Sequence, residues 1–248
     1  MRFFAAAAIL LMPVAAPAQI KVITSGGFSA ALRELLPQFE KATGITVTAT
    51  SGASQGTDPN TIGAQLRRGV PADVVIMSRE GLAALIPEGR IVAGSDFDLA
   101  QTPLGVSVRA GAPKPDIGTV EAFKQAMLRA KSVTFPGSTT GIWMKDKLFP
   151  QLGIAEQMST KITSTGVAAV ARGDAEIAAQ PVSELIHAEG ADFVGTIPKE
   201  IQYVSVFAAA MVSGSKEPES SKRLIAFLKS KDALPAIEKS GMEPPPGR

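Results

Sequence analysis

The sequence predicts an α/β protein whose mostly parallel sheets carry helices on both faces. Strand patterns and helix patterns alternate along the chain, which is typical of such sheets. Several strands run into the next helix through short Ser, Thr and Gly segments. The 248 residues, 45% of them hydrophobic and 19% charged, are enough for one large core or two smaller ones.

The first third of the chain contains three strand–helix units. Strands are predicted where β-branched residues cluster, at 20–24, 45–50 and 73–77. Helices are predicted where apolar residues recur every three or four positions, at about 28–42, 58–69 and 79–86. Gly44 is expected to end the first helix, and Asp58-Pro59 has the sequence of an N-cap followed by Pro at the first helical position.

The rest of the chain continues the alternation. Strands are predicted at 104–109, 132–135, 175–179 and 202–211. Helices are predicted at about 120–130, 142–151, 166–172 and 217–229, with a last short one before Pro244. Residues 136–141 are expected to form a loop, and Ser183 is expected to cap a further helix.

The N-terminus has the three parts of a secretory signal peptide. Arg2 supplies the charge, residues 3–12 are apolar, and Ala16-Pro17-Ala18 fits the small-x-small rule. We expect cleavage after Ala18 and a periplasmic location, with a retained anchor as the alternative. No later apolar run is long enough to cross a bilayer.

Composition excludes several kinds of site. The chain has no cysteine, which excludes disulfides, thiolate nucleophiles and Cys-ligated metals. Its single histidine, His187, excludes a histidine-rich metal site, so neither a metal nor a cofactor is expected. The net charge is +2 with both signs interspersed, so no basic stripe for nucleic acid is present.

Polar residues gather where the predicted strands end, the edge at which such sheets bind ligands. Hydroxyls and unpaired N–H groups at helix starts bind anions, so we expect a small anionic ligand here. The candidate ligand-binding residues are Ser25, Gly26, Gly27, Ser51, Ser54, Ser78, Ser138, Thr139, Thr140, Gly141 and Gln180. The alternatives are helix capping for the serines and threonines, and a surface position for the 51–57 loop and Gln180.

Four segments resemble the periplasmic molybdate-binding proteins of ABC importers over nearly the whole chain after the leader. They are Ser-Gly-Gly-Phe at 25–28, Gly-Val-Pro-Ala-Asp-Val-Val-Ile-Met-Ser at 69–78, and segments 132–141 and 170–177. The resemblance implies the two-lobed fold of a periplasmic binding protein with two crossing hinge strands. Lobe one would be 19–100 plus 207–248, and lobe two 101–206. A binding protein of this type captures its anion between the lobes and delivers it to importer membrane subunits; we expect a monomer.

The chain departs from this family at two points. Molybdate binders carry a tyrosine near the end of the strand where this chain has Ala179-Gln180-Pro181, and its only tyrosine is Tyr203. Gly26-Gly27 also leaves more room than bulkier residues. Both departures favour a larger anion, such as an organic carboxylate, over a tetrahedral oxyanion.

The glycine-rich first loop and segment 180–185 resemble an aconitate isomerase-like branch of the family. The alternative function is therefore an enzyme that interconverts cis- and trans-aconitate. Such a proton shift needs a base, for which Glu184 and His187 are the nearest candidates. Arg79 and Arg109 could pair with carboxylates or be surface residues, and Trp143 is expected in the core or on the cleft wall. The leader and the lack of a helix-turn-helix segment argue against the sensing domain of a transcription regulator.

Overall fold

A computed structural model describes residues 18–247 of the chain. Except for Ala18, the predicted signal peptide lies outside the described residues. The strands are β1 (Gln19–Thr24), β2 (Thr46–Ser51), β3 (Val74–Ser78), β4 (Phe97–Arg109), β5 (Val133–Thr134), β6 (Ile162–Thr163), β7 (Ile177–Pro181), β8 (Ala191–Thr196) and β9 (Val204–Met211). The α-helices are α1 (Gly26–Thr43), α2 (Ile62–Arg67), α3 (Arg79–Leu85), α4 (Val120–Arg129), α5 (Thr139–Trp143), α6 (Phe149–Gln151), α7 (Ala155–Ser159), α8 (Val167–Arg172), α9 (Val182–Leu185), α10 (Pro218–Lys229) and α11 (Leu234–Lys239). A π-helical turn (Met144–Leu148) joins α5 to α6, and 3₁₀ turns cover Lys199–Ile201 and Lys231–Ala233.

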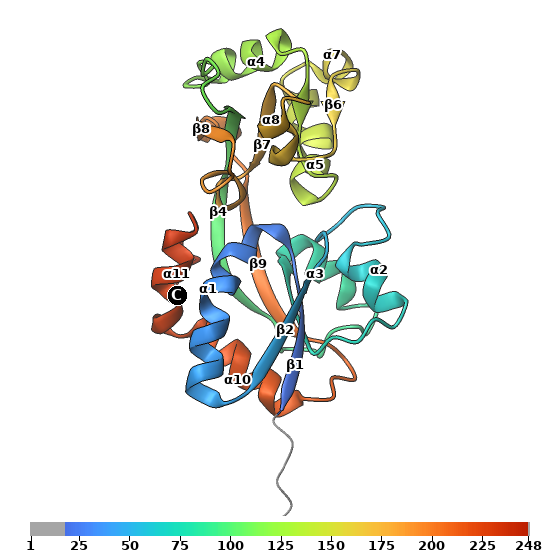
Figure 1. Cartoon of the computed structure of the whole chain (residues 1–248). Coiled ribbons are helices and arrows are strands. Elements are labelled where there is room, and N and C mark those ends of the chain that lie inside the picture. Colours follow the sequence, from blue (N-terminus) through green and yellow to red (C-terminus); the bar gives the residue numbers. More distant parts are fainter. Residues whose placement is uncertain (1–17, 248) are drawn as a thin grey trace, which may run out of the picture.

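The chain folds into two lobes joined by a narrow waist (Figure 1). The first lobe holds β1 to β3, α1 to α3, α10 and α11; the second lobe holds α4 to α9 and β5 to β8. Strands β4 and β9 run through the waist side by side and pair antiparallel. The predicted two-lobed α/β fold with crossing strands is confirmed, whereas the lobe boundaries at 100/101 and 206/207 stay a prediction.

The sheet of the first lobe is covered by helices on both faces. Alternate residues of β3 point to opposite faces, as the pleat of a strand requires. Val74 and Ile76 pack with α1, α10 and α11, whereas Val75 and Met77 pack with α2 and α3. The second lobe has its own core around Val106, Phe123 and Phe135.

The strand order is β2-β1-β3-β9-β4-β7-β5-β6, with β8 also pairing β4. The antiparallel pairs among the described residues all involve β4 or β9, and the other pairs are parallel. Strand β4 pairs with β9 up to Pro103 and with β7 from Leu104 onward. One continuous strand therefore passes from one lobe's sheet into the other's.

Most predicted elements are present, with informative differences at their ends. Gly44 ends α1 in the left-handed conformation, at φ 70°, as predicted. The helix start at Asp58-Pro59 is wrong: α2 begins at Ile62, because the Thr61 hydroxyl caps it by accepting from the Ala64 N–H.

Two further predicted helix starts are wrong. The helix predicted to begin at residue 142 begins at Thr139, so Thr139, Thr140 and Gly141 are its first turn rather than a loop. Ser183 is not an N-cap, because α9 begins one residue earlier, after Pro181.

Candidate functional site

A cavity of about 580 Å³ lies between the lobes, and we call it the interlobe cleft. The first lobe contributes the end of β1, the end of β2 with its following loop, and the end of β3. The second lobe contributes the start of α5 and the β7–α9 turn, and β9 contributes from the waist. The lining residues are Ser25, Gly26, Ser51, Gly52, Ala53, Ser54, Asp58, Asn60, Ser78, Pro136, Ser138, Thr139, Thr140, Pro181, Glu184, Ser205 and Phe207.

Eight of the eleven predicted ligand-binding residues lie in the wall of this cleft. They are Ser25, Gly26, Ser51, Ser54, Ser78, Ser138, Thr139 and Thr140. Ser25 and Thr139, from opposite lobes, thus line one common cavity. Their arrangement follows from the topology, because the carboxyl ends of β1, β2 and β3 meet at one edge. That these residues bind a ligand stays a prediction.

The two lobes touch across the cleft through hydrogen bonds. The hydroxyls of Ser78 and Thr139 are 2.8 Å apart and share a hydrogen bond. The N–H of Gln55 donates to the Ser138 hydroxyl at 3.3 Å. Both contacts join the rims that we predicted to hold an anion.

The capping alternatives hold for some of these hydroxyls and not for others. Ser78 Oγ accepts from the Gly81 N–H at 3.2 Å, so it caps α3 as well as lining the cleft. Ser25 precedes α1 but makes no capping bond, and its buried Oγ has no hydrogen-bond partner among residues 18–247. A buried hydroxyl that lines a cavity without a partner is available to a ligand.

The other three predicted residues lie behind the wall. Gly27 is buried under the ring of Phe207, and a Cβ there would be 2.0 Å from that ring. Gly141 packs against the backbone, since a Cβ there would be 2.2 Å from the carbonyl oxygen of Pro136. Gln180 is buried and does not line the cleft; its amide bonds Glu184 instead.

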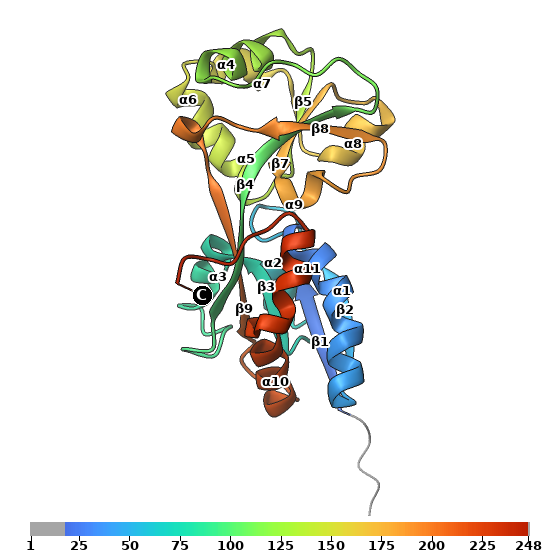
Figure 2. The ribbon, with the colours of Figure 1, turned by 90° about the vertical axis from the view of Figure 1, so that its left-hand side faces the viewer.

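Glu184 is the ionisable group that most distinguishes the cleft. It belongs to α9, a short helix that lies at the junction of the lobes and packs against α1 (Figure 2). Its Oε1 lies beside the first turn of α1, where a Cβ on Gly26 would be 3.3 Å away. Burial raises the pKa of its carboxyl to about 7, and the hydrogen bond from Gln180 opposes part of that rise.

The ligand-binding set predicted from sequence omitted several wall residues. Glu184 entered only as a possible base, because nothing local shows that α9 packs against α1. Ser205 and Phe207 lie within a strand, where the pattern indicates core rather than cleft. Asp58 and Asn60 were assigned to a helix that starts later.

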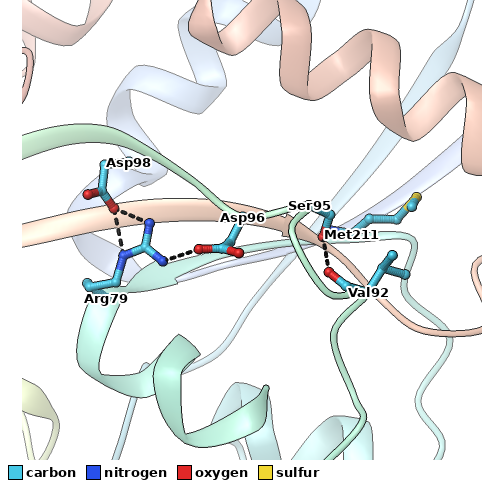
Figure 3. A network of polar contacts seen from close by, with 6 residues as sticks. All are labelled: Arg79, Val92, Ser95, Asp96, Asp98 and Met211. Carbon is cyan, nitrogen blue, oxygen red and sulfur yellow. Dashed lines mark hydrogen bonds and ion pairs between the residues drawn. The ribbon is translucent and has the colours of Figure 1, made fainter. Parts of the chain in front are cut away.

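Neither predicted cation faces the cleft, and none of the residues that line it in the described chain is Lys, Arg or His. Arg79 pairs instead with Asp96 and Asp98 at the start of β4 (Figure 3). Its Nη1 donates to Asp96 at 2.5 Å and its Nε to Asp98 at 2.7 Å. Arg109 lies at the distal end of β4, near Gly173. A bound anion would therefore be held by neutral donors.

The remaining singled-out residues lie outside the wall. Trp143 stacks on Tyr203 with 5.1 Å between ring centroids. The Tyr203 hydroxyl donates to Glu80 on α3, so this aromatic pair ties the second lobe to the first. The imidazole of His187 bonds the Lys239 carbonyl oxygen at 2.8 Å.

No group of three or more His, Asp or Glu side chains converges in a metal-ligating arrangement within residues 18–247. In the same range no helix combines the length and apolar character needed to cross a membrane.

Comparison with known proteins gives consistent matches over almost the full chain. A family profile described as bacterial extracellular solute-binding protein matches residues 20–243. An aconitate isomerase from Pseudomonas sp is 40% identical over 233 residues, covering 92% of this chain and 89% of that protein. The molybdate-binding protein ModA of Azotobacter vinelandii is 25% identical over 244 residues, covering 94% and 92%.

Solved structures share the fold. The Azotobacter vinelandii periplasmic molybdate-binding protein superposes with a TM-score of 0.75 at 22% identity, covering 91% of this chain and 99% of that one. Together these matches confirm the resemblance that the loop motifs indicated.

Proposed function

The chain belongs to the bacterial extracellular solute-binding protein family, and from this premise we propose that it is an isomerase of aconitate or a closely related unsaturated tricarboxylate. The observation that carries the proposal is Glu184, a carboxyl in the interlobe cleft whose pKa burial raises to about 7. A group with such a pKa can both take and return a proton near neutral pH. The 40% identity to a protein named aconitate isomerase supports the same conclusion.

The proposed reaction is a proton shift across three carbons. Glu184 takes a proton from the CH₂ carbon of the ligand, and the electron pair moves into a new double bond toward the central carbon. The former double bond opens at the same time, and its vinylic CH carbon receives the proton and becomes the new CH₂. The product is constitutionally the same acid with the opposite geometry, so atoms and charge balance.

Negative charge spreads onto the ligand's carboxyl oxygens during this shift. The first turns of α1 and α5 border the cleft with N–H groups that lack a partner inside their helices. Such groups stabilise developing charge best when they are fixed before the reaction. The hydroxyls of Ser25, Ser138 and Thr140 are suited to hold the carboxylates.

The test is to incubate the purified protein with trans-aconitate in deuterated buffer and follow it by proton NMR. We expect conversion to cis-aconitate, with deuterium on its CH₂ carbon in those turnovers in which the Glu184 carboxyl exchanges its proton with the buffer before returning one. Glu184→Gln is expected to lower kcat by at least about 100-fold, the usual contribution of an acid–base group. The matched control is Glu189→Gln, an exposed glutamate that follows the same helix.

A second candidate is passive capture of an anion for an ABC importer. Family membership and the ModA relatives favour it, as does a cleft lined by neutral donors. In that case no conversion and no deuterium uptake occur, and the ligand only raises the melting temperature, by an amount set by its concentration and Kd. A screen with molybdate, sulfate, citrate and aconitate identifies the anion. Under both candidates we propose export to the periplasm with cleavage after Ala18, and the monomeric state stays a prediction.

A further inference from the structure

Gln180 occupies a position that the proposed reaction leaves unexplained. It lies near the end of β7, is 3% exposed, and pairs with Gly105 of β4. The sequence predicts it as a ligand donor, yet it does not line the interlobe cleft. Both ends of its amide are used inside the protein.

The backbone fixes which way this amide points. Gln180 Oε1 accepts from the N–H of Val167 at the start of α8, and a backbone N–H can only donate. The NH₂ end must therefore face Glu184, where it donates to Oε2. If the amide were rotated by 180°, its NH₂ group would face the Val167 N–H, and both are donors. Its oxygen would then face Oε2 of Glu184, which is also an acceptor in the carboxylate.

This bond makes the two oxygens of Glu184 unequal. Oε2 faces a permanent donor, so it is the poorer site for a proton. Oε1 is the nearer of the two to Gly26, which lines the cleft: a Cβ placed there would be 3.3 Å from Oε1 and 3.7 Å from Oε2. Because Gln180 bonds Oε2, we infer that Oε1 is the oxygen that faces a ligand. Glycine at residue 26 leaves room for that oxygen, because even a methyl group there would touch it at 3.3 Å.

We propose that Gln180 is a positioning residue that holds Oε2 of Glu184 and thereby leaves Oε1 as the oxygen that exchanges a proton with the ligand. The inference rests on the proposed function, in which Glu184 moves the proton. It adds an explanation for why this chain has a glutamine, anchored to α8, immediately behind the cleft wall.

No charged neighbour competes with this role. Burial and the Gln180 hydrogen bond are the causes of the Glu184 pKa shift, and no ionised side chain of the described residues contributes to it. His187, one turn along, is bonded to the Lys239 carbonyl, and Lys239 itself pairs with Glu34. Asp58 is the other carboxyl on the cleft wall.

The test uses Gln180→Met, which has similar length and no donor, and measures kcat, KM and their pH profiles with aconitate. We expect kcat to fall with KM nearly unchanged, because Gln180 does not reach the ligand. The limb of the kcat/KM profile that reports Glu184 ionisation should move up by about one pH unit, since a hydrogen bond that favours the carboxylate is lost. A merely structural role would lower the rate without moving that limb.

A second variant tests the same role in case Gln180→Met does not fold. Gln180→Glu keeps an oxygen acceptor for the Val167 N–H and places a second carboxyl against Glu184, so the same limb should move further upward. The matched control is Gln125→Met, which removes an exposed hydrogen bond of 2.8 Å from Gln125 to Glu121 on α4. It should change neither kcat nor the pH profile of kcat/KM.

A readout independent of turnover separates this inference from the proposed function. The carboxyl carbon of Glu184, labelled with ¹³C and assigned by its loss in Glu184→Gln, should titrate at higher pH in both Gln180 variants. An unmoved titration, or a raised KM with unchanged kcat, overturns the positioning role even if the wild type turns over. A wild type that titrates as expected but converts no aconitate overturns the proposed function and the role of Gln180 in it, while leaving the electrostatic coupling intact.

Discussion

Replacing Glu184 by glutamine should remove a pH-dependent penalty on the folded state. The ordinary pKa of 4.5 is raised to about 7 by burial in the cleft wall. The native state therefore holds a proton that the unfolded chain has released between about pH 4.5 and 7. Stability that this group contributes at low pH is consequently lost as the pH rises through that window.

The magnitude follows from the two pKa values. At 1.36 kcal/mol per pH unit, raising the pKa from 4.5 to about 7 corresponds to at most about 3 kcal/mol. A domain of this size changes its Tm by roughly 2–4 °C per kcal/mol. Glutamine keeps an oxygen that accepts from Gln180. The variant should therefore match the wild type near pH 5 and melt up to roughly 6–12 °C higher at pH 9.

Calorimetric melting of both proteins from pH 5 to 9 measures this difference. Glu189→Gln, which removes an exposed carboxyl, should show no such trend. A Tm difference between Glu184→Gln and wild type that stays constant across this range would refute the reasoning. It would mean that the carboxyl is solvated, and the physical basis for its acid–base role would be gone.

Three further substitutions test the packing and the closure of the lobes. Gly27→Ala should destabilise the protein by about 1–3 kcal/mol in denaturant unfolding, because its methyl group would overlap the Phe207 ring. Thr139→Val removes the hydroxyl that meets Ser78 across the cleft, so ligand affinity should fall by up to about tenfold in titration calorimetry. Tyr203→Phe loses the hydrogen bond to Glu80 on α3 but keeps the aromatic ring, so the ligand should dissociate several-fold faster. The fluorescence of Trp143, the single tryptophan, which stacks on this ring, can follow the dissociation.

The first two substitutions have a control variant, and the third has an outcome that would contradict it. The control for Gly27→Ala is Gly118→Ala, at an exposed position where the new methyl group would be 3.4 Å from the nearest atom, Oδ1 of Asp116. This variant should leave the denaturation midpoint unchanged. Thr160→Val changes an exposed threonine at the end of α7 and should bind as the wild type does. An unchanged dissociation rate in Tyr203→Phe would show that the bond to α3 does not hold the lobes closed.

The fold was predictable where its signals are local. Alternating strands and helices, and a glycine such as Gly44 after an amphipathic helix, are read from a few neighbouring residues. The first half of β4 was missed because Asp98, Gln101 and Pro103 do not resemble a strand. It is a strand because β9 pairs with it at the waist, a contact more than 90 residues away in sequence. β8 was missed for a similar reason, since it is only half-buried and pairs β4 alone.

The candidate site also has parts that local sequence predicts and parts that depend on long-range contacts. Hydroxyls at strand ends were found because their position at the sheet edge follows from the order of elements. Glu184 was not assigned to the cleft wall, since its place depends on the packing of α9 from the second lobe against α1 of the first. Gln180 was expected near the end of its strand, but its partners within the protein could not be predicted, because the sequence does not show that Val167 at the start of α8 donates its N–H group to this side chain.

The choice between a receptor and an enzyme comes down to one carboxyl. A receptor for anions gains affinity from neutral donors and loses it when a carboxylate faces its ligand, since like charges repel strongly in a desolvated cleft. Capture alone therefore gives no reason to bury Glu184 at a penalty of at most about 3 kcal/mol near neutral pH. Proton transfer does give a reason, because the same burial that destabilises the carboxylate gives it the pKa that a reversible proton shift requires. The pH dependence of stability therefore tests whether the Glu184 pKa is raised, and the conversion of aconitate tests whether that carboxyl moves a proton.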